Sequence, residues 1–116
     1  MGITASRSSG PRATMALSKA QAIVDANPVA IFSKTYCPYC TRVKKLFSQL
    51  GAKAKVVELD TEEDGDEIQN ALAQMTGQRT VPNVFIGGKS IGGSDSTSAL
   101  HSQGKLVPQL QAVKAL

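Results

Sequence analysis

The sequence predicts an α/β domain built on a small mixed four-stranded sheet with helices on both faces. Helix and strand signals alternate in the order helix, strand, helix, strand, helix, two strands, two helices, and such alternation is typical of layered α/β folds. Gly87-Gly88 separates two short apolar runs, which predicts a tight hairpin and hence an antiparallel pair. A length of 116 residues suits one domain with its own core.

In the first quarter of the chain, Ser18 is the expected N-cap of a helix that Asn27-Pro28 ends. The apolar residues of this helix share one face, and they are Ala20, Ile23 and Val24. The apolar run Val29–Phe32 then predicts a short buried strand. We therefore expect the domain to span residues 16–116 and residues 1–15 to form a flexible tail, because the tail is rich in Ser, Gly and Arg and contains no acid.

A second helix is predicted by apolar residues at i, i+3, i+4 and i+7, with Gly51 as its stop; they are Val43, Leu46, Phe47 and Leu50. Lys55–Leu59 follows as a strand, parallel to the first if the helix between them makes a right-handed crossover.

The second half of the chain holds a helix that Gly77 ends, the hairpin, and two final helices. The apolar positions that mark the first of these helices are Ile68, Leu72 and Met75. The hairpin strands are Asn83–Ile86 and Lys89–Ile91. Ser94 or Asp95 is the expected cap of a short helix, and the last helix is lined by Leu106, Leu110 and Val113.

The charges are unevenly placed. Seven of the nine acidic residues lie between Glu58 and Glu67, a run that we interpret as the solvated start of a helix. The rest of the chain is strongly basic, which favours small anions or acidic protein surfaces as partners. Nucleic acid is not expected, because the five aromatic residues are not interleaved with the basic ones. No apolar run is long enough to predict a membrane span.

The chain has only two cysteines, Cys37 and Cys40, in the stretch SKTYCPYC between a predicted strand and a predicted helix. Pro38 suits the first helical turn, where its missing N–H costs nothing. The partial positive charge of the helix N-terminus, with Lys34 nearby, favours a thiolate at Cys37. Cys40 is then placed to resolve a mixed disulfide, so the spacing indicates thiol–disulfide exchange.

Two other uses of the cysteines fit less well. A structural bridge between Cys37 and Cys40 would close a loop of about four residues and stabilise the fold by only about 2 kcal/mol. A zinc site needs about four ligands, whereas the chain offers no third cysteine and only one histidine, His101. We expect no bound metal.

Cys37-Pro38-Tyr39-Cys40 resembles the active site of dithiol glutaredoxins. Thr80-Val81-Pro82 and Gly92-Gly93-Ser94-Asp95 extend this resemblance from about Met15 to the C-terminus. The resemblance implies a thioredoxin-like fold and a glutathione-dependent oxidoreductase. Its substrates would be protein–glutathione mixed disulfides and protein disulfides, with glutathione as co-substrate and no permanently bound cofactor.

The resemblance also implies the residues of the site. Cys37 would be the catalytic nucleophile and Cys40 the resolving cysteine, with Pro82 following a cis peptide bond. The residues that would bind glutathione are Lys34, Tyr39, Gln69, Thr80, Val81, Pro82, Gly93, Ser94, Asp95 and Ser96. Many members of the family carry Asp where this chain has Ser96, whose hydroxyl can still form a hydrogen bond.

Two other functions stay open at this stage. One is a dimer that binds a [2Fe-2S] cluster through Cys37 and glutathione, against which the stiff Pro38 argues. The other is a general disulfide reductase similar to thioredoxin. We expect a monomer in the cytoplasm; an organelle-targeting role of the tail and N-myristoylation of Gly2 are compatible with the sequence.

Overall fold

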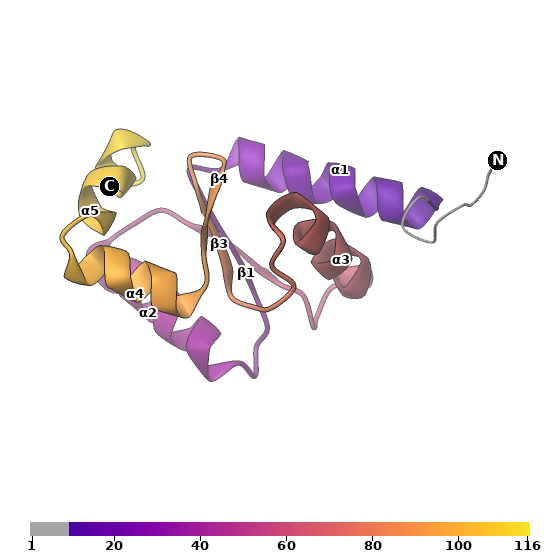
Figure 1. Cartoon of the computed structure of the whole chain (residues 1–116), viewed down its shortest axis with the longest axis horizontal. Helices are drawn as coiled ribbons and strands as arrows, with labels where there is room; N and C mark the ends of the chain where they lie inside the picture. The colour runs from indigo at the N-terminus through magenta and orange to yellow at the C-terminus, as the bar shows by residue number, and fades with distance from the viewer. Residues whose placement is uncertain (1–9) are drawn as a thin grey trace.

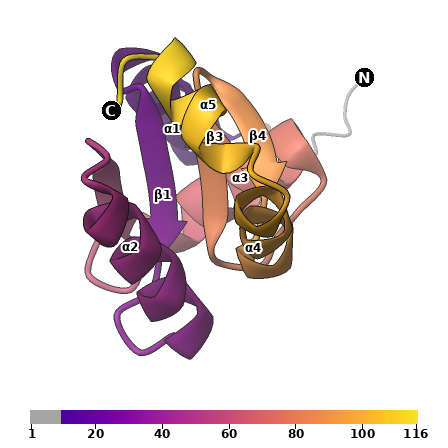
Figure 2. The same ribbon diagram turned by 90° about the vertical axis from the view of Figure 1, so that its left-hand side faces the viewer.

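The computed structural model describes residues 10–116 and consists of one four-stranded sheet between two layers of helices (Figures 1 and 2). The elements in chain order are α1 (Pro11–Ala26), β1 (Val29–Ser33), α2 (Pro38–Leu50), β2 (Lys55–Glu58), α3 (Gly65–Thr76), β3 (Asn83–Ile86), β4 (Lys89–Gly92), α4 (Ser94–Ser102) and α5 (Leu106–Ala112). This order confirms the α/β class and each predicted helix and strand. The predicted myristoylation pattern at Gly2 lies outside the described residues.

The strands are arranged in the order β2-β1-β3-β4. β1 and β2 pair in parallel, whereas β1 with β3 and β3 with β4 pair antiparallel. The sheet is therefore mixed, as predicted, and the parallel pair is the one joined through α2. β1 lies inside the sheet, so its last residue, Ser33, lies near the middle of the end of the sheet where the strand stops. The loop that follows leads from this point to the start of α2.

The two faces of the sheet are covered by different helices. Alternate residues of β1 point to opposite faces, so Ala30 and Phe32 pack in a core with α1 and α3. Val29 and Ile31 pack in a second core with α2 and α5. Figure 2 shows α2, α4 and α5 in front of the sheet and α1 and α3 behind it. The expectation of helices on both faces is confirmed.

The start of α1 differs from the prediction. The helix begins at Pro11, whereas the sequence predicted Ser18 as its cap, so residues 11–15 of the predicted tail are helical. Figure 1 shows α1 running alongside α3, and Arg12 and Lys19 form ion pairs with Glu67 and Asp64 at N–O distances of 2.9 and 3.2 Å. The helix is thus extended by contacts with α3, which a local pattern cannot indicate.

The start of α4 also differs in one detail. Its N-cap is Gly93, and no side chain of residues 10–116 makes a capping hydrogen bond there, so neither Ser94 nor Asp95 is the cap. Both residues lie in the first turn of the helix instead. Their side chains are therefore available for contacts outside the helix.

Candidate active site

The nucleophile position of the predicted site lies where β1 passes into α2. Cys37 is the N-cap of α2, with extended backbone (φ −87°, ψ 116°), and Pro38 occupies the first helical turn. The Cys40 N–H donates a hydrogen bond to the Cys37 sulfur, at 3.2 Å. This N–H is one of the groups that a helix N-terminus leaves without a partner, and it favours negative charge on the Cys37 sulfur.

The two cysteines are both reduced and differ in environment. Cys37 is half-buried, and its thiol faces the Val81 carbonyl oxygen at 4.0 Å. Cys40 is completely buried. Burial raises the pKa of the Cys40 thiol to about 11, and the hydrogen bond with Cys37 adds to the rise. At neutral pH, Cys40 is therefore a protonated thiol, and Cys37 is the more accessible sulfur.

The peptide bond between Val81 and Pro82 is cis, as the resemblance implied. Val81 lies in the segment between α3 and β3, and the contact with Cys37 brings this segment against the start of α2. Within residues 10–116, no acceptor receives the Val81 N–H. The backbone at Val81 therefore presents an unused donor beside the Cys37 sulfur.

Gln78 holds the turn around this cis bond, and sequence reasoning missed it. Its side-chain amide donates to the carbonyl oxygens of Thr80 and Pro82, both at 2.9 Å. The only sequence signal was its position, directly after the helix stop Gly77 and before Thr80. A single amide therefore fixes the backbone on both sides of Val81.

The end of β4 completes the site. Gly92 has φ +99°, and a Cβ there would lie 2.8 Å from the Ser96 hydroxyl oxygen. A Cβ on Gly93 would lie 3.3 Å from the Pro82 carbonyl oxygen. The two glycines thus let the N-terminus of α4 approach the cis turn, which a larger residue would keep away.

One groove joins these parts. Its volume is about 380 Å³, and it is lined by Tyr39, Gln78, Thr80, Val81, Pro82, Gly93, Ser94, Asp95 and Ser96. Eight of the ten predicted glutathione-binding residues are in this lining, and they come from three separate parts of the chain. The Arg42 guanidinium stacks over the Tyr39 ring, 5.3 Å from its centroid. The groove borders Cys37 through Tyr39 and Val81.

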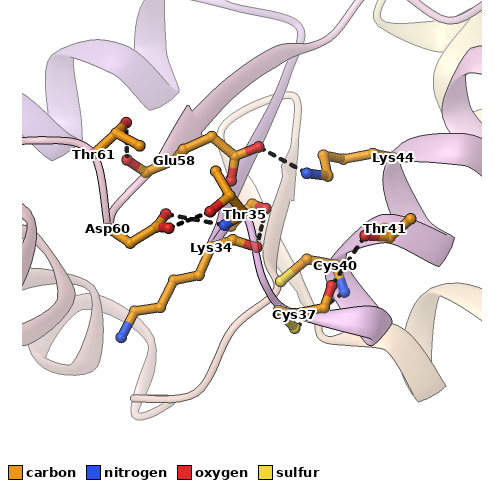
Figure 3. A network of polar contacts seen from close by, with 10 residues as sticks. Lys34, Thr35, Cys37, Cys40, Thr41, Lys44, Glu58, Asp60 and Thr61 are labelled. Carbon is orange, nitrogen blue, oxygen red and sulfur yellow. Dashed lines mark hydrogen bonds and ion pairs between the residues drawn. The ribbon is translucent and has the colours of Figure 1, made fainter.

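Lys34 and Gln69, the other two predicted binding residues, lie outside the lining of this groove. The Gln69 amide donates to the Arg79 carbonyl oxygen, at 2.8 Å. In Figure 3, the Lys34 side chain extends away from both cysteines. Gln69 thus supports the chain that leads to Thr80.

The acidic run follows the prediction at its end, in α3, but not at its beginning. Asp66 and Glu67 do lie in the first turn of α3. Glu58, in contrast, ends β2 and forms an ion pair with Lys44 of α2 at 2.7 Å (Figure 3). Asp60 accepts two hydrogen bonds from Thr35, in the loop that leads to Cys37. The interpretation of Glu58 and Asp60 as part of a solvated helix start is therefore wrong.

Among residues 10–116, no cluster of three or more His, Cys, Asp or Glu side chains could hold a metal ion. In the same part of the chain, no helix has both the length and the apolar character needed to cross a membrane.

The family model for glutaredoxins matches residues 29–91, which include both cysteines, the cis turn and most of the hairpin. The chain belongs to the glutaredoxin family. This is a family of oxidoreductases, so the cysteine pair is a redox-active pair.

Individual relatives agree with this assignment. A glutaredoxin from Ricinus communis is 70% identical over 102 residues, which cover 88% of this chain and 100% of the relative. Glutaredoxin-C2 from Arabidopsis thaliana is 65% identical and covers 88% of this chain and 92% of the relative. A crystal structure of a buckwheat glutaredoxin–glutathione complex, 63% identical, superposes with a TM-score of 0.89 over 90% of this chain and 96% of its own. The thioredoxin-like fold is confirmed.

Proposed function

We propose that the protein reduces protein–glutathione mixed disulfides, and also protein disulfides, with glutathione as the electron donor. One observation carries the proposal: the groove beside Cys37 combines a free backbone N–H at Val81, the N-terminus of α4 and the Asp95 carboxylate. Glutathione has a peptide backbone, carboxylates and an ammonium group. The groove offers a complementary partner to the peptide backbone, to the γ-glutamyl carboxylate and to the ammonium group.

The γ-glutamyl end of glutathione suits the α4 side of the groove. A helix N-terminus attracts a carboxylate through its free N–H groups, and α4 begins at Ser94, within the lining. Asp95 in the same turn is exposed and carries the charge that an ammonium group requires. Val81 would pair with the peptide of glutathione as a neighbouring strand does, which directs its sulfur to Cys37.

The glycine carboxylate would bind Lys34 and Gln69, by resemblance to the family. Lys34 is half-buried, and its side chain can turn about several bonds to reach an anion. The buckwheat relative was solved in complex with glutathione, which supports the proposal for a chain that is 63% identical to it.

The proposed reaction has two steps. The Cys37 thiolate attacks the glutathione sulfur of the mixed disulfide, which forms a Cys37–glutathione disulfide and releases the protein thiolate. A second glutathione thiolate then attacks the glutathione sulfur on Cys37 and releases oxidised glutathione, so that Cys37 returns as a thiolate. Across the two steps, one glutathione thiolate and the mixed disulfide give the protein thiolate and oxidised glutathione, so one disulfide is broken and one is formed.

Cys40 is not required for this route. In the reduced protein, burial raises the pKa of the Cys40 thiol to about 11, and the Cys40 side chain is buried, so a second glutathione can attack the Cys37–glutathione disulfide without help from Cys40. For a protein disulfide, Cys40 would attack the mixed disulfide at Cys37, release the reduced protein and form the Cys37–Cys40 bridge.

The test is the glutathione-dependent reduction of the mixed disulfide of glutathione and 2-mercaptoethanol. We expect Cys37→Ser to abolish the activity and Cys40→Ser to retain it, while Cys40→Ser loses activity on a protein disulfide. Cys37→Ser with substantial activity would contradict the assignment of the nucleophile. Equal enzyme-dependent activity with a small monothiol that lacks the peptide and carboxylates of glutathione, such as cysteamine at the same concentration, would contradict the role of glutathione.

We further propose that the chain acts without an iron–sulfur cluster. Pro38 directly follows Cys37 in the first turn of α2, where its ring restricts the backbone beside the sulfur that a cluster would need. Anaerobic reconstitution with iron, sulfide and glutathione should give a colourless monomer. Visible charge-transfer absorption in a dimeric fraction would contradict this.

A further inference from the structure

Asp60 and Thr35 join two segments that are 25 residues apart in the chain. The Thr35 N–H donates to one carboxylate oxygen of Asp60, at 3.0 Å. The Thr35 hydroxyl donates to the other oxygen. Both oxygens of a single carboxylate therefore hold one residue, so the contact fixes the position and the rotation of Thr35 (Figure 3).

Thr35 belongs to the turn that carries the nucleophile. The Cys37 N–H donates to the Lys34 carbonyl oxygen, at 3.1 Å, which closes a tight turn with Thr35 and Tyr36 at its centre. Tyr36 is 71% exposed, so it contributes little packing to the turn. Polar contacts are thus the main restraint on the backbone directly before Cys37.

The Asp60 end of the contact is itself anchored. The Leu59 N–H donates to the Ser33 carbonyl oxygen, at 2.8 Å, which continues the pairing of β2 with β1. On the other side of Asp60, the N–H and the hydroxyl of Thr61 both donate to the Glu58 carbonyl oxygen. Asp60 therefore extends from a fixed turn at the end of β2, and it can transmit that rigidity to Thr35.

Asp60 is ionised at neutral pH. The side-chain and backbone hydrogen bonds from Thr35 lower the pKa of the Asp60 carboxyl, and the nearby charge of Lys34 lowers it further. Hydrogen bonds to a charged acceptor are stronger than those between neutral groups.

We propose that Asp60 is a positioning residue for the redox reaction: through Thr35, its carboxylate sets the turn that aims the Cys37 sulfur at the Cys40 N–H. The proposal rests on the proposed role of Cys37 as the nucleophile. Without the contact, the turn gains freedom, the sulfur spends less time 3.2 Å from the Cys40 N–H, and its thiolate is less favoured. Asp60 is exposed and belongs to neither core, so the fold should persist without it.

The experiment measures alkylation of Cys37 by iodoacetamide at neutral pH in a Cys40→Ser background, where the chain has one thiol. Asp60→Ala removes both acceptors. Asp60→Asn keeps an acceptor for the Thr35 N–H and offers an amide to its hydroxyl oxygen. Asp66→Ala is the matched control, because Asp66 is an exposed acid of the same acidic run and its loss changes the net charge equally. Thermal unfolding of each variant establishes the temperature at which all are folded.

We expect Asp60→Ala to slow alkylation about five- to twentyfold, because iodoacetamide reacts with the thiolate and the variant loses the contact that keeps the Cys37 sulfur at the Cys40 N–H. Asp60→Asn should react within about threefold of the parent rate, and Asp66→Ala should react at the parent rate. The proposal is overturned if Asp60→Ala equals Asp66→Ala, or if the alanine and asparagine variants are equally slow, since charge alone would then explain the effect.

The alkylation assay contains no glutathione, so its outcome is independent of the substrate proposed above. If glutathione-dependent turnover is absent while the Asp60 series behaves as expected, the proposed substrate is wrong and the positioning role stands. If turnover is present and the Asp60 variants are alkylated at the same rate as Asp66→Ala, only the positioning role is wrong.

Discussion

The Cys40 N–H lies 3.2 Å from the Cys37 sulfur, so the two cysteines share a hydrogen bond while both are reduced. Cys37 gains a donor at the start of α2, whereas the Cys40 side chain is buried below it. The first turn of α2 therefore gives the Cys37 sulfur a hydrogen-bond donor and an accessible position, whereas it buries the Cys40 sulfur, which stays a protonated thiol.

The raised pKa of Cys40 predicts a loss of stability at high pH. Because the folded-state pKa of about 11 is above the usual 9.0, the unfolded chain loses the proton first, and stability falls as pH rises from about 9 to 11. We expect a decrease of about 1–3 kcal/mol in the free energy of unfolding. Urea titrations of the reduced protein at several pH values measure it. Cys40→Ser should lack this component, and an identical pH dependence in the variant would contradict the assignment.

Asp95 should determine the affinity for glutathione. Asp95→Asn removes the charge proposed to face the ammonium group, which should raise the KM for glutathione about five- to tenfold, an effect of about 1–1.4 kcal/mol. Steady-state kinetics with varied glutathione measure the change. Asp25→Asn is the matched control, because Asp25 is an exposed acid on α1, at a groove that contains no residue of the candidate site. If both variants have the same KM, Asp95 does not bind the ammonium group.

Lys34 should contribute to glutathione binding through its positive charge. Lys34→Met keeps most of the side-chain length but cannot bind the glycine carboxylate, so the KM for glutathione should rise about three- to tenfold. Lys45→Met, an exposed lysine of α2, is the comparison for a general loss of positive charge. Glutathione ethyl ester at the glycine end should be a poor substrate for the parent and should show little difference between the parent and Lys34→Met. A full effect of the mutation on the ester would exclude contact with that carboxylate.

Gln78 should stabilise the backbone conformation on either side of Val81, which lines the groove. Gln78→Ala removes two hydrogen bonds to the Thr80 and Pro82 carbonyl oxygens, which should cost about 1–3 kcal/mol of stability. The KM for glutathione should also rise, since Val81 lies between the two carbonyls. Chemical denaturation and steady-state kinetics report the two effects. Gln74→Ala, at an exposed position of α3, should change neither, and a Gln78 variant that matches it would contradict the role.

Gly92 should be intolerant of a side chain for two reasons that can be separated. Gly92→Ala places a Cβ 2.8 Å from the Ser96 hydroxyl oxygen at φ +99°, so it should suffer both strain and a clash. Gly104 also has a positive φ, of +71°, and a Cβ there meets no atom of the described part of the chain within 4 Å, so Gly104→Ala carries the strain of about 1–2 kcal/mol alone. Thermal denaturation should rank Gly92→Ala as the less stable variant, and only this variant should lose activity. Equal stability of the two variants would show that Ser96 moves aside freely.

Local patterns were sufficient for most of the fold. The helix stops at Gly51 and Gly77 and the Gly87-Gly88 hairpin were predicted correctly, because each depends on a backbone conformation with positive φ that glycine adopts without strain. The groove was also largely predictable, since Thr80-Val81-Pro82 and Gly93-Ser94-Asp95 carry the family resemblance. Periodicity similarly placed Val43 and Phe47 in the core.

The sequence by itself determined the order of the elements and the placement of the cysteines at a strand–helix junction, because these follow from contacts within about four residues. Only the tertiary structure decided that α1 begins at Pro11, that Gln78 spans the cis turn and that Asp60 holds Thr35. Each of these depends on a polar side chain and on the path of a loop around it. A hydrogen bond requires positions fixed to a fraction of an ångström, and the packing of the whole domain sets those positions.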